Sequence, residues 1–93
     1  MNEKQMQFLA QSFNLMTFKK MCNYKDCHKY PSKEIILYET DIITKEEKIV
    51  ASLYFCSEHY NKVARQITTK LNEIANKRWV IDKRVRETGF ITH

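Results

Sequence analysis

Hydrophobic residues near the start of the chain recur at helical spacing. They are separated by three, four and three positions, at Met6, Leu9, Phe13 and Met16. Side chains at these intervals share one face of a helix and can bury it. We therefore predict a helix over residues 3–18, inside an N-terminal helical segment of residues 1–20. The end of this segment is also compatible with a short strand that leads into the first cysteine.

Two later stretches are rich in β-branched and aromatic residues, as strands are. Residues 34–40 read EIILYET, and residues 48–55 read KIVASLYF. The link between them contains no Asn-Gly or Asp-Gly pair, which favours a hairpin with a loose loop over one with a tight turn. Turn-forming residues and two cysteines precede the first stretch. We predict that residues 21–56 form a zinc loop and a β-hairpin.

The last third of the chain predicts one long, basic helix over residues 57–88. Ser57 suits its N-cap and Gly89 its C-terminal stop. Apolar residues follow a spacing of four and three, at Tyr60, Ala64, Ile67, Leu71, Ile74, Ile81 and Val85, with Arg78 in one apolar slot. A continuous helix of this length extends about 48 Å, against a radius of gyration of about 12–13 Å for such a chain. We expect it to bend near Asn76 to Val80 or to project toward a partner.

These elements predict one small α+β domain, residues 1–93. The chain contains one Gly and one Pro, which favours long regular elements with few tight turns. A single core of this size is marginal and often needs a staple such as a metal. The long helix has two uses. It buries its apolar face in the core, which we favour, or it pairs with the same helix of a second chain as a homodimer.

The cysteines and one histidine have the spacing of a metal site. Cys22 and Cys27 enclose four residues, and Cys56 and His59 enclose two, with 28 residues between the pairs. Three cysteines cannot all pair within one chain, and such clusters beside a histidine more often bind metal. Zinc takes four thiolate or imidazole ligands in a tetrahedron. We predict one structural Zn²⁺ per chain, held by these four residues.

Other interpretations of the same residues are open. His28 competes as fourth ligand, although its adjacency to Cys27 strains joint coordination. The cysteines can also be buried thiols beside a surface histidine, and His93 a solvated tail. A catalytic zinc needs an open position for water, which four protein ligands do not leave. Glu58 better serves the positive end of a helix than a general base. We predict no catalytic residue.

The arrangement resembles a treble-clef zinc finger over roughly residues 20–75. In that family a cysteine pair in a loop is followed by a β-hairpin, and the second ligand pair comes from the start of a helix, in motifs such as FCSEH at 55–59. The usual first pair encloses two residues, whereas four stand here. The family spans nucleic-acid binding, protein binding and a few nucleases, so the resemblance implies fold more than function.

Charge is distributed unevenly, and the net charge is +5. Residues 1–33 and 56–93 are basic, whereas residues 34–55 are acidic, which is typical of chains that contact a polyanion. Near the metal motif, Tyr24 and Tyr30 interleave with lysines and can either stack on bases or cover the metal. The predicted nucleic-acid contacts are Lys19, Lys20, Lys25, Lys29, Lys62, Arg65, Lys77, Arg78, Trp79, Lys83, Arg84 and Arg86. A solvated helix face is the alternative for these cations.

The pattern favours a small zinc-finger protein that binds DNA or RNA, with DNA preferred, in a regulatory role such as transcription control. The alternative is a protein-interaction adaptor or inhibitor, in which zinc is structural and the long helix docks a partner. A nuclease ranks below both, since no second metal position is visible. No apolar run approaches the length of a membrane span. We expect a cytoplasmic protein, or an intracellular one of a virus or mobile element.

Overall fold

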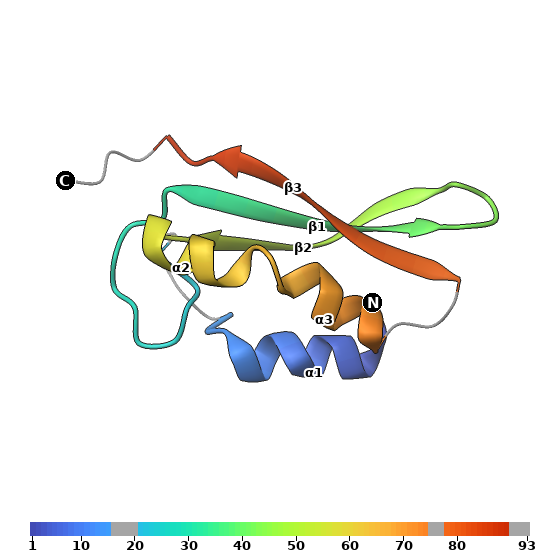
Figure 1. Ribbon diagram of the computed structural model, residues 1–93, viewed down its shortest axis with the longest axis horizontal. Helices are drawn as coiled ribbons and strands as arrows, with labels where there is room; N and C mark the ends of the chain where they lie inside the picture. The colour runs from blue at the N-terminus through green and yellow to red at the C-terminus, as the bar shows by residue number, and fades with distance from the viewer. Residues whose placement is uncertain (16–20, 75–77, 90–93) are drawn as a thin grey trace.

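The computed structural model describes residues 1–15, 21–74 and 78–89 (Figure 1). In chain order the elements are α1 (Glu3–Ser12), β1 (Lys33–Asp41), β2 (Glu47–Phe55), α2 (Ser57–Val63), α3 (Ile67–Glu73) and β3 (Trp79–Glu87). The strands form one antiparallel sheet in the order β2-β1-β3. All three helices lie against the same face of this sheet (Figure 1). The prediction of a small α+β domain is confirmed.

The first helix begins where the sequence predicts and ends earlier. The Asn2 side chain accepts a hydrogen bond from the Gln5 backbone N–H, and the Gln5 side chain accepts one from the Asn2 N–H, both at 2.9 Å. This capping box fixes the start of α1. At Phe13 the backbone is extended, because it forms a bridge with Tyr24. The predicted helix over 3–18 therefore stops at Ser12, and residues 16–20 lie outside the described residues.

The central strand β1 is buried by both neighbours and by the helices. Ile35 pairs with Leu53 of β2 on one side and with Val85 of β3 on the other. Ile35 and Leu37 point into the core, where both are fully buried. The helices contribute Leu9 from α1, and Ile67 and Leu71 from α3. Fully burying one such side chain contributes about 1.5–3 kcal/mol.

The single helix predicted over 57–88 is wrong. The chain forms two short helices, and residues from Trp79 onward form the edge strand β3. Along β3 the buried Ile81 lies between the exposed Val80 and Asp82, which is the two-residue period of a strand. The hydrophobic spacing misled the prediction because Ile81 and Val85, four positions apart, fit either period. What decides is pairing with β1, a contact distant in sequence.

Polar side chains of α1 cap the end of α3. The Gln5 side chain is 2 % exposed and donates from Nε2 to the Leu71 carbonyl at 2.9 Å. Asn2 donates from Nδ2 to the Ile74 carbonyl at 2.8 Å. The last carbonyls of a helix have no partner within it. The Leu71 carbonyl also accepts from the Ile74 N–H at 3.3 Å, so Gln5 adds a second bond there, and the two side chains join the start of α1 to the end of α3.

Asparagine side chains cover the outward backbone of both sheet edges. Asn72 of α3 donates to the Ile81 carbonyl and accepts from the Ile81 N–H, each at 2.9 Å. Asn23 acts in the same way on β2. Its backbone N–H donates to the Tyr54 carbonyl at 2.7 Å, and its Oδ1 accepts from the Tyr54 N–H at 2.6 Å. Each contact satisfies backbone groups that an open edge exposes.

Candidate metal centre

The four predicted ligands come from the loop before β1 and from the start of α2. Cys22 and Cys27 lie in that loop, which turns where Asp26 takes a φ of 63°. The loop is closed by hydrogen bonds from the Cys22 N–H to the Lys29 carbonyl at 3.0 Å and from the Cys27 N–H to the Tyr24 carbonyl at 3.1 Å. Both cysteines therefore have defined positions.

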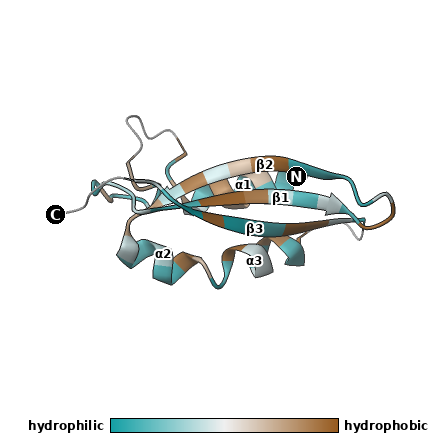
Figure 2. Cartoon of the chain, turned by 90° about the horizontal axis from the view of Figure 1, so that it is seen from above, coloured by the Kyte–Doolittle hydropathy of each residue, from teal (hydrophilic) through white to brown (hydrophobic). Residues whose placement is uncertain are grey.

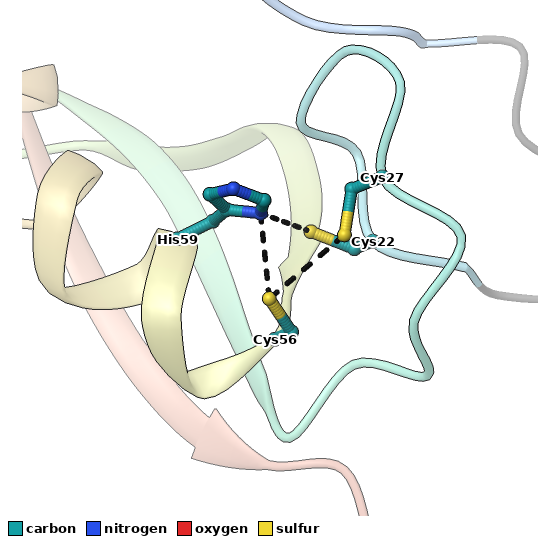
Figure 3. Close-up of side chains that lie close together, drawn as sticks. All are labelled: Cys22, Cys27, Cys56 and His59. Atoms are coloured by element: carbon teal, nitrogen blue, oxygen red, sulfur yellow. Dashed lines mark hydrogen bonds between the residues drawn. The ribbon is translucent and has the colours of Figure 1, made fainter.

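The second ligand pair is placed by the junction of β2 and α2. Cys56 follows the last residue of β2 and is the N-cap of α2. His59 lies in the first turn of that helix, three positions later, so both side chains project from one side. Figure 3 shows the two pairs pointing toward one another. The fold thus brings the four residues together from positions far apart in the sequence.

The distances between the candidate ligand atoms fall in a narrow range. The Nδ1 atom of His59 lies 3.4 Å from the Cys56 sulfur and 3.6 Å from the Cys22 sulfur. The Cys27 and Cys56 sulfurs lie 3.9 Å apart (Figure 3). All four atoms lie within 4.8 Å of one another. The three cysteines are free, and no disulfide joins them.

These distances can be compared with those of a tetrahedral ion. With metal–sulfur bonds of about 2.3 Å and metal–nitrogen bonds of about 2.0–2.1 Å, two sulfurs lie about 3.8 Å apart and a sulfur and a nitrogen about 3.5–3.6 Å apart. Three of the six separations, 3.9 Å, 3.4 Å and 3.6 Å, agree within about 0.2 Å, and the other three are no longer than 4.8 Å. The four residues are therefore arranged to hold one metal ion.

Aromatic rings support the site. The ring of Tyr24 stacks on the imidazole of His59, with centroids 3.9 Å apart and planes 7° from parallel. Phe13 and Phe55 meet edge to face at 5.2 Å, in the core cluster that also contains Cys22 and Cys56. Tyr24 therefore covers the site rather than offering a free face to a base. It also fixes the orientation of the His59 ring.

Burial of the site controls the charge of Cys22. Burial raises the pKa of the Cys22 thiol to about 12, and the nearby sulfurs of Cys27 and Cys56 act in the same direction. Hydrogen bonds involving the backbone of Cys56 and Tyr24 offset only part of this rise. Without a cation this thiol keeps its proton at neutral pH. A bound metal ion stabilises the thiolate and displaces that proton.

His28 does not join the cluster. His28 is exposed and does not belong to the group of residues whose ligand atoms converge. His93 lies outside the described residues. Glu58 makes an exposed ion pair with Lys29 at 3.4 Å, which lowers the pKa of Glu58. Glu58 therefore joins the loop to α2, and the geometry retains the four predicted ligands.

Most of the predicted C-terminal basic cluster is engaged within the protein. Arg78 pairs with the buried Asp41 at 2.8 Å. Arg84 pairs with Glu47 at 2.8 Å, and Arg86 pairs with Glu34. The Lys83 ammonium donates to the Ala64 carbonyl, and Trp79 lies 4.8 Å from the Lys48 ammonium. Arg78 and Arg86 thus pair with acids of β1, whereas the partners of Arg84 and Lys83 lie on β2 and at the end of α2.

The remaining predicted cations differ in their surroundings. Lys25, Lys62 and Arg65 are exposed, and none of them has an ion pair among residues 1–15, 21–74 and 78–89. Lys70 of α3 is likewise exposed and has no ion pair within these ranges. Lys19, Lys20 and Lys77 lie outside the described residues. Among the described residues, Lys25, Lys62, Arg65 and Lys70 are therefore exposed cations without an ion pair, as are Lys4 and Lys45 elsewhere on the surface.

One residue important for the site was not predicted from the sequence. Asn23 joins the metal loop to β2 through Tyr54, and its Nδ2 donates to the Asn14 carbonyl at 2.8 Å. It thus connects the loop, the sheet and the chain that follows α1. In the sequence it is only a turn-forming residue between the two cysteines. Its partner on β2 is 31 positions away, so no local signal marks it.

Comparisons with known proteins identified no relative of this chain. No protein-family model, curated protein or solved structure matches the chain. Within the described part of the chain, no helix is long and apolar enough to cross a membrane.

Proposed function

We propose that the centre binds one structural Zn²⁺ through Cys22, Cys27, Cys56 and His59. Three sulfurs and one imidazole nitrogen are a ligand set that zinc prefers, and three of the distances between these atoms are close to those of a tetrahedral site, which supports the proposal. Four protein ligands complete the tetrahedron, which favours a structural over a catalytic role. The order of metal loop, β-hairpin and helix start also supports a treble-clef-like arrangement. When bound, the ion cross-links the loop to the start of α2.

We propose further that this zinc-stabilised domain binds nucleic acid, with DNA preferred, through a basic ridge. We use this name for Lys62, Arg65 and Lys70, which project from α2, α3 and the turn between them. The observation that carries the proposal is a contrast: these exposed cations have no ion pair within the described part of the chain, whereas Arg84 and Arg86 of β3 are paired. Unpaired surface cations neutralise phosphates and release counterions.

The structure of α2 and α3 explains why the basic ridge faces solvent. Val63, Ala64, Ile67 and Leu71 are buried against the sheet. The ridge residues occupy the alternating positions, and all three are exposed. Asn61, Gln66 and Thr69 of the same segment are also exposed, and their polar groups can donate hydrogen bonds to phosphate oxygens. Residues 61–70 thus offer cations and neutral donors together.

Two exposed residues of the metal loop offer further groups that a nucleic acid can contact. Tyr30 is 60 % exposed, and its ring can stack on an unpaired base. Lys25 is exposed in the same loop. Tyr24 does not serve in this way, because it stacks on His59. A nucleic acid with unstacked bases therefore suits the loop, whereas the basic ridge requires only a phosphate backbone.

The test measures binding of the intact zinc-loaded protein to a labelled single-stranded DNA and to its duplex across salt concentration. The variant is Arg65→Gln with Lys70→Gln. The matched control is Lys4→Gln with Lys45→Asn, which removes the same charge from exposed positions elsewhere. We expect the ridge variant to lower the slope of log affinity against log salt by about 0.7–0.9 for each phosphate that it no longer neutralises. The control should keep the slope of the natural protein.

Two results would contradict this function. One is the absence of measurable binding to either DNA at about 50 mM salt, where phosphate contacts are strong. The other is an equal fall in affinity in the ridge variant and in its charge-matched control. The second result would indicate a general effect of net charge and no defined surface.

The alternative of an adaptor with a long docking helix loses its docking element, because residues 79–87 form β3. A homodimer through that helix loses the same element. The regulatory role and the viral or mobile-element origin stay predictions from the sequence.

A further inference from the structure

The three thiols of the metal centre differ in their access to solvent. Cys22 is 0 % exposed and Cys56 is 4 % exposed, whereas Cys27 is half-buried. The neighbours of Cys27 in the metal loop, Asp26 and His28, are both exposed. Partly exposed cysteines react with solutes, whereas buried ones are inert. A small polar molecule that approaches from water therefore meets Cys27 before the other two cysteines.

The sulfur of Cys22 is held in place by the surrounding backbone and by the core. Hydrogen bonds involving the backbone of Cys56 and Tyr24 reach this sulfur, and the side chain belongs to the buried core cluster. A large movement of the Cys22 sulfur breaks those bonds and disturbs the core. Cys22 is therefore the thiol that keeps its position when the centre changes.

The sulfurs of Cys27 and Cys56 are well placed to bond with each other. They lie 3.9 Å apart, on opposite sides of the gap between the metal loop and the start of α2 (Figure 3). A disulfide has a sulfur–sulfur distance of about 2.05 Å, so the two atoms must approach by about 1.9 Å. Cys27 lies outside the helices and strands. The metal loop can therefore supply this movement without breaking the sheet, which Figure 2 shows from above.

We propose that Cys27 is an oxidation site, at which hydrogen peroxide joins Cys27 to Cys56 as a disulfide and so removes two of the four zinc ligands. The metal is then released, because only Cys22 and His59 remain to hold it. This release rests on the proposed zinc centre. Coordination favours the reaction, since a bound metal keeps its cysteine ligands as thiolates, the form that peroxide oxidises.

The oxidation proceeds in two balanced steps. The Cys27 thiolate attacks one oxygen of hydrogen peroxide, so that a sulfur–oxygen bond forms, the oxygen–oxygen bond breaks and hydroxide leaves. Cys27, which has lost two electrons, is then a sulfenic acid. The Cys56 thiolate attacks the Cys27 sulfur, so that the disulfide forms, the sulfur–oxygen bond breaks and a second hydroxide leaves. Two thiolates and one peroxide thus give one disulfide and two hydroxide ions.

The disulfide replaces the metal as a cross-link between the loop and α2. Both join Cys27 to Cys56, which enclose 28 residues, so the central strand β1 stays within a closed segment of chain. Oxidation therefore removes the metal and preserves the fold, whereas chelation removes both the metal and the cross-link. The oxidised protein should melt at least about 12 °C above the reduced protein from which zinc has been removed.

Peroxide titration of the intact zinc-loaded protein tests the oxidation site. Replacing a cysteine would remove a ligand together with its thiol, so the natural chain is used. A coloured chelator follows the released zinc, and the remaining thiols are then alkylated in denaturant before digestion with trypsin. Trypsin cleaves after lysine and places each cysteine on its own peptide, at residues 21–25, 26–29 and 49–62. The pairing is therefore read directly by mass spectrometry.

We expect one zinc ion to be released for each peroxide consumed, a disulfide between peptides 26–29 and 49–62, and an alkylated Cys22. Protein given chelator without peroxide is the matched control and should lose zinc without forming a disulfide. A reductant with added zinc should restore the original centre.

Four results would overturn the proposal. One is zinc that stays bound, with all three thiols free, through several equivalents of peroxide. Another is a main disulfide that includes peptide 21–25, and a third is Cys27 oxidised beyond the sulfenic acid without any disulfide. The fourth is an oxidised protein that melts no higher than the chelated one. Metal analysis before any peroxide is added separates these results from failure of the zinc centre itself, which would show as a protein purified without zinc.

Discussion

Removing the metal should unfold the whole domain and not only release the loop. Cys22 and Cys56 belong to the buried core. The chain between Cys27 and Cys56 contains β1, the strand between β2 and β3 in the sheet. Loss of the cross-link therefore frees the segment that carries the central strand. We expect at least residues 22–67 to lose their structure after complete chelation.

The size of this effect follows from the loop that the metal closes. The cross-link from Cys27 to Cys56 encloses about 30 residues, and closing such a loop stabilises a fold by about 3–4 kcal/mol through chain entropy. Structural zinc in small fingers contributes on the order of 10 kcal/mol in apparent folding free energy. For a domain of this size each kcal/mol moves the melting temperature by about 4–8 °C. The loop term alone therefore predicts a fall of at least about 12 °C.

The assay is thermal melting, followed by circular dichroism, before and after dialysis against a strong chelator and again after zinc is restored. His59→Ala should melt like the chelated protein at every zinc concentration. His28→Ala, at an exposed histidine in the metal loop, is the matched control and should keep the zinc-dependent melting temperature. A fall of less than about 5 °C after complete removal of metal would contradict a stabilising cross-link, because it corresponds to about 1 kcal/mol or less.

Three further predictions concern the pH dependence of the centre and its surroundings. Because the pKa of Cys22 is raised to about 12, binding of zinc displaces the thiol proton throughout the neutral range. The logarithm of the zinc affinity, measured by chelator competition, should therefore rise by at least about one for each pH unit from 6.5 to 8. An affinity that does not change with pH would exclude this proton displacement. Gln5→Leu removes the buried hydrogen bond to the Leu71 carbonyl, which then keeps only the 3.3 Å bond from the Ile74 N–H, and should lower the free energy of unfolding in urea by about 0.5–1.5 kcal/mol. The exposed Gln7→Leu should change it by less than about 0.5 kcal/mol. Tyr24→Leu removes the ring stacked on His59, worth about 0.5–1.5 kcal/mol, and should weaken zinc binding about 2- to 12-fold by competition; unchanged affinity would show that the stack does not support the site.

The parts of the fold that were predictable from the sequence depend on local signals. The strands over 34–40 and 48–55 are β1 and β2, and each of their ends lies within one residue of its predicted bound. Ser57 begins α2, as its capping character indicated, although Cys56 occupies the N-cap itself. The metal ligands were predictable because their spacing is a chemical requirement.

The parts that were not predictable depend on contacts distant along the chain. Ile81 and Val85 fit a helical stripe and a strand equally well, and only the pairing of β3 with β1 decides between them. The same pairing places Arg84 near Glu47 and Arg86 near Glu34, each more than 30 positions away in the sequence. A local charge pattern therefore suggested a free basic cluster where the fold forms ion pairs.

Metal analysis of the purified protein, combined with X-ray absorption at the zinc edge, tests the proposed zinc centre without any intermediate assumption. We predict about one zinc per chain, with three sulfurs at about 2.3 Å and one nitrogen at about 2.0–2.1 Å. We also predict that Cys22→Ser no longer holds the metal and that His28→Ala retains it. A folded protein without zinc, or a zinc shell of oxygen and nitrogen only, would contradict the proposed centre.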